Sequence, residues 1–263
     1  MTEFSPPAGH CRIRVVDRFE ALITTPFADG VNALCWVRDL PGDFASVAAR
    51  IAEATWGANR RGGESDDGGD DGEGEGILGL DAEFLESLDL DAEGKTAVRV
   101  MLEDFRRLRE QGLQPELNAI RAYPRDTEAE SGEGGVRTDV YSWHADSATT
   151  EADTWLCTYS GACSEGLANE EARRVVDFPE RRAALLREFG GEDAVDGEEF
   201  REFLNENCYD LHYLPLSGAA PYAFGVGHLW RIAVEYPGCP VPPCVHRAPE
   251  TGPGDAPRLL LIS

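Results

Sequence analysis

The sequence has little positive charge, no long apolar run and no closely paired cysteines. Lysine and arginine account for 24 of its 263 residues, against 49 acidic residues, which leaves a formal net charge of −25. Nucleic acids and anionic membrane surfaces are bound by positive protein surface. We therefore expect neither a nucleic acid nor a membrane among the partners of this protein.

Targeting and redox signals are equally scarce. No apolar run approaches the about 20 residues that a membrane-spanning helix needs. The opening segment MTEFSPPAGHCRIRVV lacks the charged-then-apolar layout of a secretory signal peptide. The seven cysteines are an odd number and form no C-x-x-C motif. These absences favour a cytoplasmic protein with reduced thiols, with a Cys239–Cys244 disulfide as the lesser alternative.

The N-terminal region, residues 1–112, is predicted to be mainly helical. In DFASVAARIAEATW, apolar residues recur at helical spacing after Asp43, which can cap the helix. A second helix is predicted in EGKTAVRVMLEDFRRLREQG, which stops at Gly112. Residues 60–76 between them form a Gly-rich, acidic run that predicts a flexible surface loop. We expect this helical region to pack against a second, C-terminal region and support it.

The C-terminal region, residues 113–263, has a sequence pattern that predicts a β-barrel. Its short segments are rich in β-branched and aromatic residues: ELNAIRAYP, RTDVYSWHAD, TWLCTYSG, GHLWRIAVEYP and RLLLIS. No crossover helices alternate with them, which favours an antiparallel barrel or jelly roll. Residues 168–207 predict a helical insertion of two helices. The predicted fold class is mainly β with α.

One group of residues in this region has the composition of a metal site. His144 and Asp146 stand two positions apart in a predicted strand, so their side chains should point to the same face. His246 ends a later predicted strand, and Arg258 opens the last one. Two imidazoles and one carboxylate suit divalent iron and leave ligand positions open on one side. If the last two strands pair, Arg258 should lie near His246.

This pattern of His-x-Asp, a distal His and a later basic residue resembles the Fe(II)/2-oxoglutarate-dependent oxygenases. The resemblance implies a double-stranded β-helix, that is, a jelly-roll or cupin-like barrel. It also implies that His144, Asp146 and His246 hold the iron, while Arg258 binds the far carboxylate of 2-oxoglutarate. O₂ would be the co-substrate of this non-haem iron dioxygenase. Abstraction of hydrogen from a substrate C–H bond, usually followed by hydroxylation, is the implied reaction.

Two further resemblances refine this expectation. The stretch NAIRAYPRD before the metal motif is similar to prolyl-hydroxylase-like members, which makes Tyr123, Arg121 and Asn118 further candidates for contact with 2-oxoglutarate. The segments WHADSATTEADTWLCTYSGACSEGL and CVHRAPE…RLLLIS resemble a bacterial family known as a domain of unknown function, with the pattern FHVD…LCTY…HRSP…RLLL. The chain departs from that family at residues 162–164, where the family has a Gly-Thr-containing turn.

The leading hypothesis is therefore an iron- and 2-oxoglutarate-dependent oxygenase that acts on a small molecule, such as an amino acid or a natural-product intermediate. The acidic balance favours a substrate that carries an amine. A cupin-type metalloenzyme without 2-oxoglutarate and a non-catalytic metal-binding protein remain alternatives. His228 reads more simply as a core imidazole, and the open question for His212 is whether it lines the pocket. The sequence leaves the substrate, the regiochemistry and the oligomeric state open.

Overall fold

The computed structural model describes residues 10–56, 76–125, 135–190, 195–252 and 255–263. The predicted acidic loop at 60–76 lies outside these ranges, apart from Gly76. Within them, no helix combines the length and the apolar character needed to cross a membrane. All seven cysteines are free thiols, so Cys239 and Cys244 are not bonded to each other.

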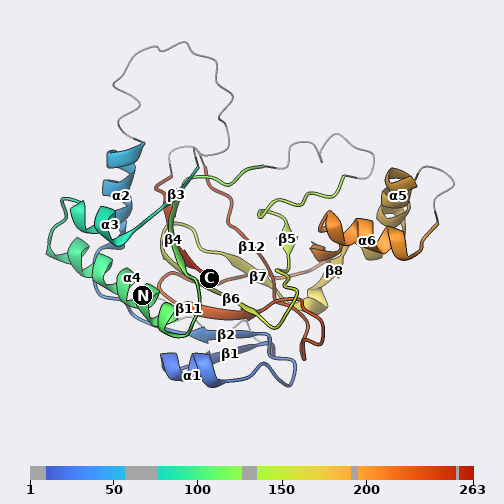
Figure 1. The fold of residues 1–263 in the computed structure, drawn as a ribbon, viewed down its shortest axis with the longest axis horizontal. Helices are drawn as coiled ribbons and strands as arrows, with labels where there is room; N and C mark the ends of the chain where they lie inside the picture. Colours follow the sequence, from blue (N-terminus) through green and yellow to red (C-terminus); the bar gives the residue numbers. More distant parts are fainter. Residues whose placement is uncertain (1–9, 57–75, 126–134, 191–194, 253–254) are drawn as a thin grey trace, which may run out of the picture.

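The described chain is mainly β-structure, arranged in two sheets (Figure 1). The larger sheet has the order β1 (Ile13–Val16), β2 (Ala33–Trp36), β11 (Leu229–Ala233), β6 (Asp153–Ser160), β13 (Arg258–Ile262), β4 (Glu116–Ile120) and β3 (Ile77–Gly79). The smaller has the order β10 (Tyr222–Ala223), β7 (Glu165–Leu167), β12 (Val245–Arg247), β5 (Trp143–His144), β9 (His212–Pro215) and β8 (Ala172–Arg174). Their named strand pairs are antiparallel, except for the parallel pair β1–β2.

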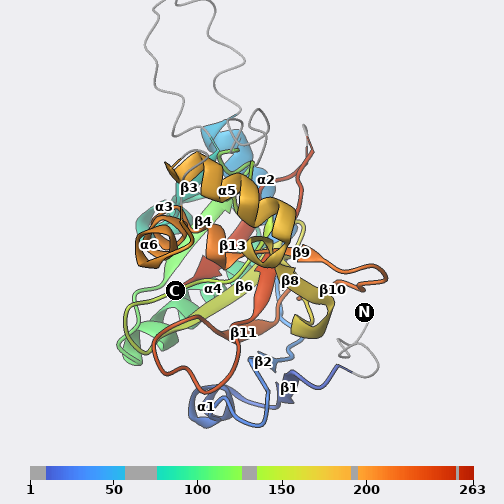
Figure 2. The same cartoon turned by 90° about the vertical axis from the view of Figure 1, so that its right-hand side faces the viewer.

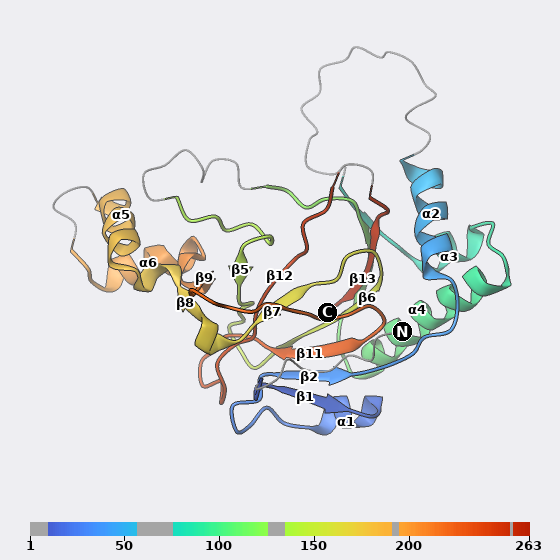
Figure 3. The ribbon, with the colours of Figure 1, turned by 180° about the vertical axis from the view of Figure 1, so that it is seen from behind.

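Helices cover the outer face of the larger sheet. These are α1 (Phe19–Thr24), α2 (Phe44–Thr55), α3 (Ala82–Ser87) and α4 (Ala92–Glu110), and Figure 3 shows α2 to α4 together at one side of the molecule. The Asp43 side chain accepts a hydrogen bond from the Ser46 amide, so the predicted cap of α2 is confirmed. Val47 and Ile51 of α2 and Met101 of α4 are buried in one apolar cluster with Leu259 and Leu261 of β13.

Alternation along the strands gives the larger sheet a second apolar face. On β6, Trp155 and Cys157 belong to the cluster under the helices, whereas Leu156 belongs to a second cluster. That second cluster contains residues of the larger sheet together with Tyr222 of β10 and Phe224, and the Phe224 and Trp230 rings lie 4.4 Å apart. The second cluster therefore fills the space between the two sheets.

The structure refines the predicted organisation along the chain. Strands β1, β2 and β3 lie before residue 112, yet they join the same sheet as β6, β11 and β13. The division of the chain at residue 112 stays a prediction. The expected strand across RTDVYSWHAD is only Trp143–His144, because the Asp139 side chain accepts hydrogen bonds from the amides of Tyr141 and Ser142 and turns the backbone there.

The insertion at residues 168–207 contains the two expected helices, α5 (Pro179–Gly190) and α6 (Glu198–Glu206). It also contains strand β8, which was not predicted and which lies between the three-residue 3₁₀ helices η2 (Asn169–Glu171) and η3 (Val175–Asp177). A third 3₁₀ helix, η4 (Tyr209–Leu211), lies just beyond the insertion. Helices α5 and α6 bury Leu185 and Phe200 in a small core of their own. They lie at the end of the molecule opposite α2 to α4, facing the viewer in Figure 2.

Candidate metal centre

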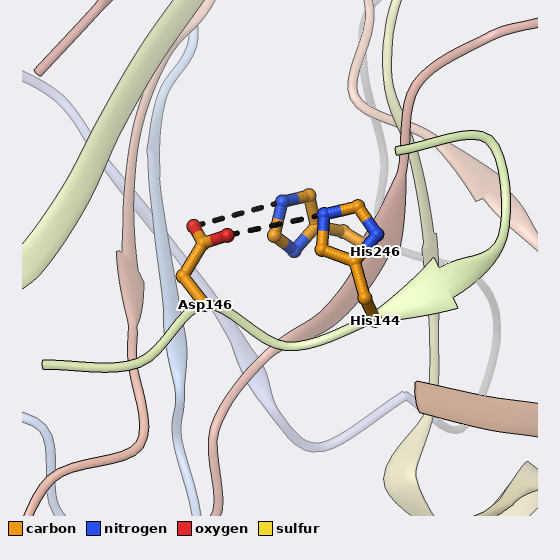
Figure 4. A group of neighbouring side chains, drawn as sticks. All are labelled: His144, Asp146 and His246. Atoms are coloured by element: carbon orange, nitrogen blue, oxygen red, sulfur yellow. Dashed lines mark ion pairs between the residues drawn. The ribbon is translucent and has the colours of Figure 1, made fainter. Parts of the chain in front are cut away.

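Two histidines of the smaller sheet and one aspartate just beyond its strand β5 converge on one point. The Nε2 atom of His144 lies 3.9 Å from one carboxylate oxygen of Asp146, and the Nε2 atom of His246 lies 3.7 Å from the other (Figure 4). One ligand atom from each residue lies within 4.8 Å of the others, so the group could hold a metal ion. The structure thus brings together the three residues that the sequence pattern selected.

The strand register explains why these side chains meet. His246 of β12 is directly opposite His144 of β5, which in turn is opposite His212 of β9. Residues directly opposite each other in antiparallel strands project from the same face of the sheet. The ring centroids are 4.5 Å apart for His144 and His246 and 5.8 Å apart for His144 and His212. The three imidazoles therefore form a row across three neighbouring strands.

Backbone carbonyls fix the orientation of both candidate ligand rings. The Nδ1 atom of His144 lies 2.8 Å from the Ser142 carbonyl oxygen, and that of His246 lies 3.3 Å from the Cys244 carbonyl oxygen. A carbonyl can only accept, so each Nδ1 must carry the hydrogen in these contacts. In the uncharged form of either ring the lone pair is then on Nε2, the atom that faces Asp146.

The charge states at the group also suit a cation. Burial lowers the pKa of His144 to about 4, and the neighbouring His246 adds to this effect, so the His144 ring is neutral near pH 7. For Asp146, burial raises the pKa, but His246, the Thr154 hydroxyl and His144 outweigh it and bring the pKa below its usual value. The group therefore offers a carboxylate and a neutral imidazole at neutral pH.

Asp146 is held in place from two sides. The Thr154 hydroxyl on β6 donates a hydrogen bond of 2.5 Å to Oδ2 of Asp146. The backbone beside it pairs with Glu235, whose amide donates to the Asp146 carbonyl at 2.8 Å and whose carbonyl accepts from Ala148 at 2.8 Å. Such outer contacts orient a metal-ligating carboxylate and support its affinity for the ion.

The donor set fits a divalent transition ion after a small contraction. Zn²⁺, for example, binds nitrogen and oxygen ligands at about 2.0–2.2 Å, so in a tetrahedral set two ligand atoms lie about 3.3–3.6 Å apart. Separations of up to 4.8 Å therefore need to close by about 1 Å around an ion. A cavity of about 450 Å³ opens at the group and is lined by His144, Asp146, Thr154, His212 and Ile262, among others.

Arg258 is a buried cation whose observed partners are all neutral. Its exposed fraction is 2 %, and its guanidinium donates to the hydroxyl oxygens of Thr158 at 3.0 Å, Ser164 at 2.7 Å and Tyr123 at 3.4 Å. Within the described residues, no carboxylate lies at ion-pair distance from it. Burial lowers the pKa of Arg258 below its usual value, which shows how poorly its charge is compensated.

Arg258 reaches the interior from the sheet opposite the metal-ligand candidates. The expected pairing of the strands that carry His246 and Arg258 is wrong, because β12 belongs to the smaller sheet and β13 to the larger one. A continuous set of contacts nevertheless connects the two residues. Ser164, which accepts from Arg258, also accepts through its carbonyl from the Phe224 amide, and the Phe224 ring lies 6.4 Å from the His246 ring.

The other candidates for 2-oxoglutarate contact separate into two groups. The Tyr123 hydroxyl accepts from Arg258, and Asn118 lies opposite Leu260, which belongs to the cluster between the sheets. Arg121 is exposed beyond the end of β4, and its guanidinium lies 5.4 Å from the ring centroid of Trp56. Because the strand has ended and the side chain turns to Trp56, the structure does not bring Arg121 to the Arg258 group.

Three further residues behave as their sequence context suggested. Arg247, next to His246, points to the opposite face, where it pairs with Glu165. His228 is buried, and its Nδ1 accepts a hydrogen bond from the Arg38 amide. His212 lines the cavity, and its Nδ1 lies 2.8 Å from the Ser142 hydroxyl.

Sequence reasoning missed the hydroxyl groups that surround these residues. Thr154 contacts Asp146, whereas Thr158 and Ser164 contact Arg258. Alternation in DTWLCTYS was the available signal, because Thr154, Leu156 and Thr158 occupy the positions between Trp155, Cys157 and Tyr159. No comparable signal marked Ser164, which lies just before β7.

No family model matches the chain, and neither a curated protein nor a solved structure shows significant similarity to it.

Proposed function

We propose that this protein is a non-haem iron, 2-oxoglutarate-dependent oxygenase that oxidises a C–H bond of a small molecule. In this proposal the two sheets form a double-stranded β-helix of the jelly-roll or cupin-like kind. Two features support it: a group of two histidines and one aspartate, and a buried arginine on the facing sheet. Two His and one carboxylate with open positions are typical of non-haem Fe(II) oxygenases.

Arg258 is the observation that carries the proposal beyond a metal site. A buried charge without an ionic partner costs several kcal/mol unless something compensates for it. Each hydroxyl that accepts from Arg258 keeps a hydrogen that it can donate, and a carboxylate accepts only. Thr158, Ser164, Tyr123 and Arg258 together thus offer an anionic carboxylate a set of donors. The far carboxylate of 2-oxoglutarate fits this requirement.

The chain's own contribution is to position the reactants and to exclude water. His144, Asp146 and His246 would hold the iron, with their rings oriented by the carbonyls of Ser142 and Cys244. Ferrous iron with bound 2-oxoglutarate and O₂ supplies the oxidising power for hydrogen abstraction from the substrate. The packed aromatic rings between the sheets keep bulk water from this side of the group.

The substrate is proposed to enter the cavity beside the metal group. Among the residues that the structure describes, no lysine or arginine lines this cavity, and the whole chain is strongly acidic. An amine-bearing molecule, such as an amino acid or a natural-product intermediate, therefore suits it better than an acidic one. Electrostatic attraction would also favour its approach.

The decisive experiment separates iron binding from 2-oxoglutarate binding. Under anaerobic conditions, Fe(II) and 2-oxoglutarate should give a weak charge-transfer band in the visible spectrum, and His246→Ala should abolish it. Arg258→Gln should keep the affinity for Fe(II) but weaken that for 2-oxoglutarate by more than 10-fold, about 1.4 kcal/mol. Arg247→Gln is the matched control, because this neighbouring arginine pairs with Glu165 on the other face.

Production of succinate then tests catalysis. The proposal expects slow, O₂-dependent succinate formation even without substrate, and loss of it in Asp146→Ala. Iron binding without succinate, with Arg258→Gln behaving as wild type, would indicate a cupin-type metalloenzyme that needs no 2-oxoglutarate. Absence of any metal affinity would contradict both ideas.

A further inference from the structure

Cys244 places an oxidisable thiol two residues before the metal-ligand candidate His246. It lies two residues before His246, so its side chain projects toward the same interior, where it is 2 % exposed and belongs to the cluster between the sheets. Its carbonyl oxygen holds the His246 ring through Nδ1. Any small rearrangement of Cys244 is therefore transmitted to a candidate ligand.

The phenol of Tyr222 lies close to the Cys244 thiol because the neighbouring residue, Gly166, has no side chain. Gly166 lies between His246 on one side and Tyr222 on the other in the register of the smaller sheet. A Cβ atom on Gly166 would lie 2.4 Å from the phenol oxygen of Tyr222, so the phenol occupies the room that this glycine leaves. The same oxygen lies 3.9 Å from Sγ of Cys244.

The two groups are held together by their surroundings. Tyr222 is 6 % exposed, its ring packs on Phe224 with centroids 5.7 Å apart, and Phe224 in turn packs on His246. The ring carbon ortho to the hydroxyl group of Tyr222 is only two bonds from the phenol oxygen. The thiol therefore lies close to the position at which sulfur adds to an oxidised phenol ring.

We propose that Cys244 and Tyr222 become joined by a thioether bond between Sγ and this ring carbon once the protein binds iron in air. The inference rests on the proposed iron site. The S–H bond of Cys244 and one C–H bond of the Tyr222 ring break, and one C–S bond forms. The two electrons and two protons pass to O₂, which becomes hydrogen peroxide. The bond would tie β10 to the residue that positions His246.

The protein contains a second tyrosine–cysteine contact that serves as an internal control. Tyr236 and Cys239 lie in a turn after β11, where the side chain of Cys239 contacts that of Tyr236. Neither residue stands in the row that contains His246 and Gly166. The proposal therefore expects no bond between Tyr236 and Cys239 under the same treatment.

Mass spectrometry of the full chain tests this directly. Metal-free protein is loaded with Fe(II) without oxygen, its iron content is measured, and it is then exposed to air. We expect the loss of two hydrogen atoms, the loss of one titratable thiol, and a joined peptide pair that contains Tyr222 and Cys244. Tyr222→Phe and Cys244→Ala should each prevent it, whereas Tyr236→Phe should not. Asp146→Ala, which should not retain iron, should also remain unlinked.

The outcomes distinguish this inference from the proposed function. Protein that holds iron but keeps its full mass after air exposure overturns the bond and leaves the iron site intact. A bond that forms equally in metal-free protein overturns the proposal as an iron-dependent step. Protein that binds no iron overturns both proposals together.

Discussion

The two sheets of this protein are built very differently. Strands of the larger sheet run from three to eight residues, and this sheet has helices on one face and the inter-sheet cluster on the other. Strands of the smaller sheet run from two to four residues, and β5, one of the two that have only two residues, carries His144. The larger sheet therefore provides most of the buried apolar area, whereas the smaller sheet provides the metal-ligand candidates.

This difference shows how stability and chemistry are divided. Buried apolar area is the main stabilising contribution in a fold of this size. Ligand residues on short strands at the edge of that core can be exchanged without removing much of it. Arg258 is the exception, because it belongs to the larger sheet and yet points between the sheets. The comparison predicts that substitutions in the smaller sheet will mainly lower metal affinity, whereas substitutions in the larger sheet will mainly lower the free energy of unfolding.

The largest expected effect is on metal affinity when a ligand is removed from the smaller sheet. Loss of a partner that only orients a ligand typically lowers metal affinity by about 10- to 100-fold. His246→Ala removes a ligand itself, so it should lower the affinity for Fe(II) or Mn(II) by more than that. The midpoint of thermal unfolding of the metal-free protein should fall by less than for a large apolar core residue, although the His246 ring is buried and packs against Phe224. Calorimetric titration and a thermal melt measure the two quantities. A large fall in metal-free stability would contradict the division.

The converse substitution lies in the larger sheet. Leu261 of β13 is fully buried under the helices, so Leu261→Ala should cost about 2–5 kcal/mol of unfolding free energy. Metal affinity of the folded fraction should stay within a few-fold of wild type. Leu214 of β9, at 36 % exposure, is the matched control and should change stability by no more than about 0.5 kcal/mol on the same change. Urea titration with and without metal tests both expectations.

The pH dependence of the metal-free protein sharpens the comparison next. Because burial lowers the pKa of His144 to about 4, the unfolded chain takes up a proton there before the folded one does. Stability should therefore be highest above the usual histidine pKa of about 6.5 and fall as the pH drops toward 4, by up to about 3 kcal/mol.

Asp146 acts in the same direction at lower pH. Its pKa in the folded protein is lowered, so its contribution is present above its usual pKa and is lost as the pH falls through the folded value. His144→Ala should flatten the profile between about pH 6.5 and 4, where the histidine contributes. An unchanged slope in this variant, followed by urea unfolding at several pH values, would contradict the assignment.

Sequence patterns predicted the helices that cover the larger sheet well and the long-range arrangement of its strands less well. Helical spacing and Asp43 located α2, and Gly112 marked the end of α4, where the backbone adopts φ 82°. Both signals act within a few residues. The strands that pair with β13 come instead from distant parts of the chain, and no local signal identifies them. The expectation that β12 lies beside β13 was therefore wrong.

The candidate site shows the same limit. The i, i+2 spacing predicted that His144 and Asp146 point together, because alternation is a local property of a strand. His246 and Arg258 were selected from their places on later predicted strands, and the resemblance then assigned their roles. The hydroxyls of Thr158 and Ser164 could not be assigned to Arg258, because Thr158 reaches it from a strand about 100 residues away and Ser164 from the segment just before β7 of the other sheet. Tyr123 was selected by resemblance, and the structure places it beside Arg258.

The smallest expected effect is at the contact that joins the two sheets through Asp146. Thr154 belongs to the larger sheet, and its hydroxyl donates at 2.5 Å to the carboxylate of Asp146, which follows β5 of the smaller one. Thr154→Val removes this donor while keeping the shape, so metal affinity should fall by about 10- to 100-fold, the usual range for an outer contact. Thr154→Ser should restore most of it, because it keeps the hydroxyl. A merely structural role predicts instead that both variants lose stability while the folded fraction binds metal as tightly as wild type. Calorimetric titration with Mn(II), beside a urea melt of each metal-free variant, therefore decides whether the larger sheet only supports the metal group or also sets its affinity.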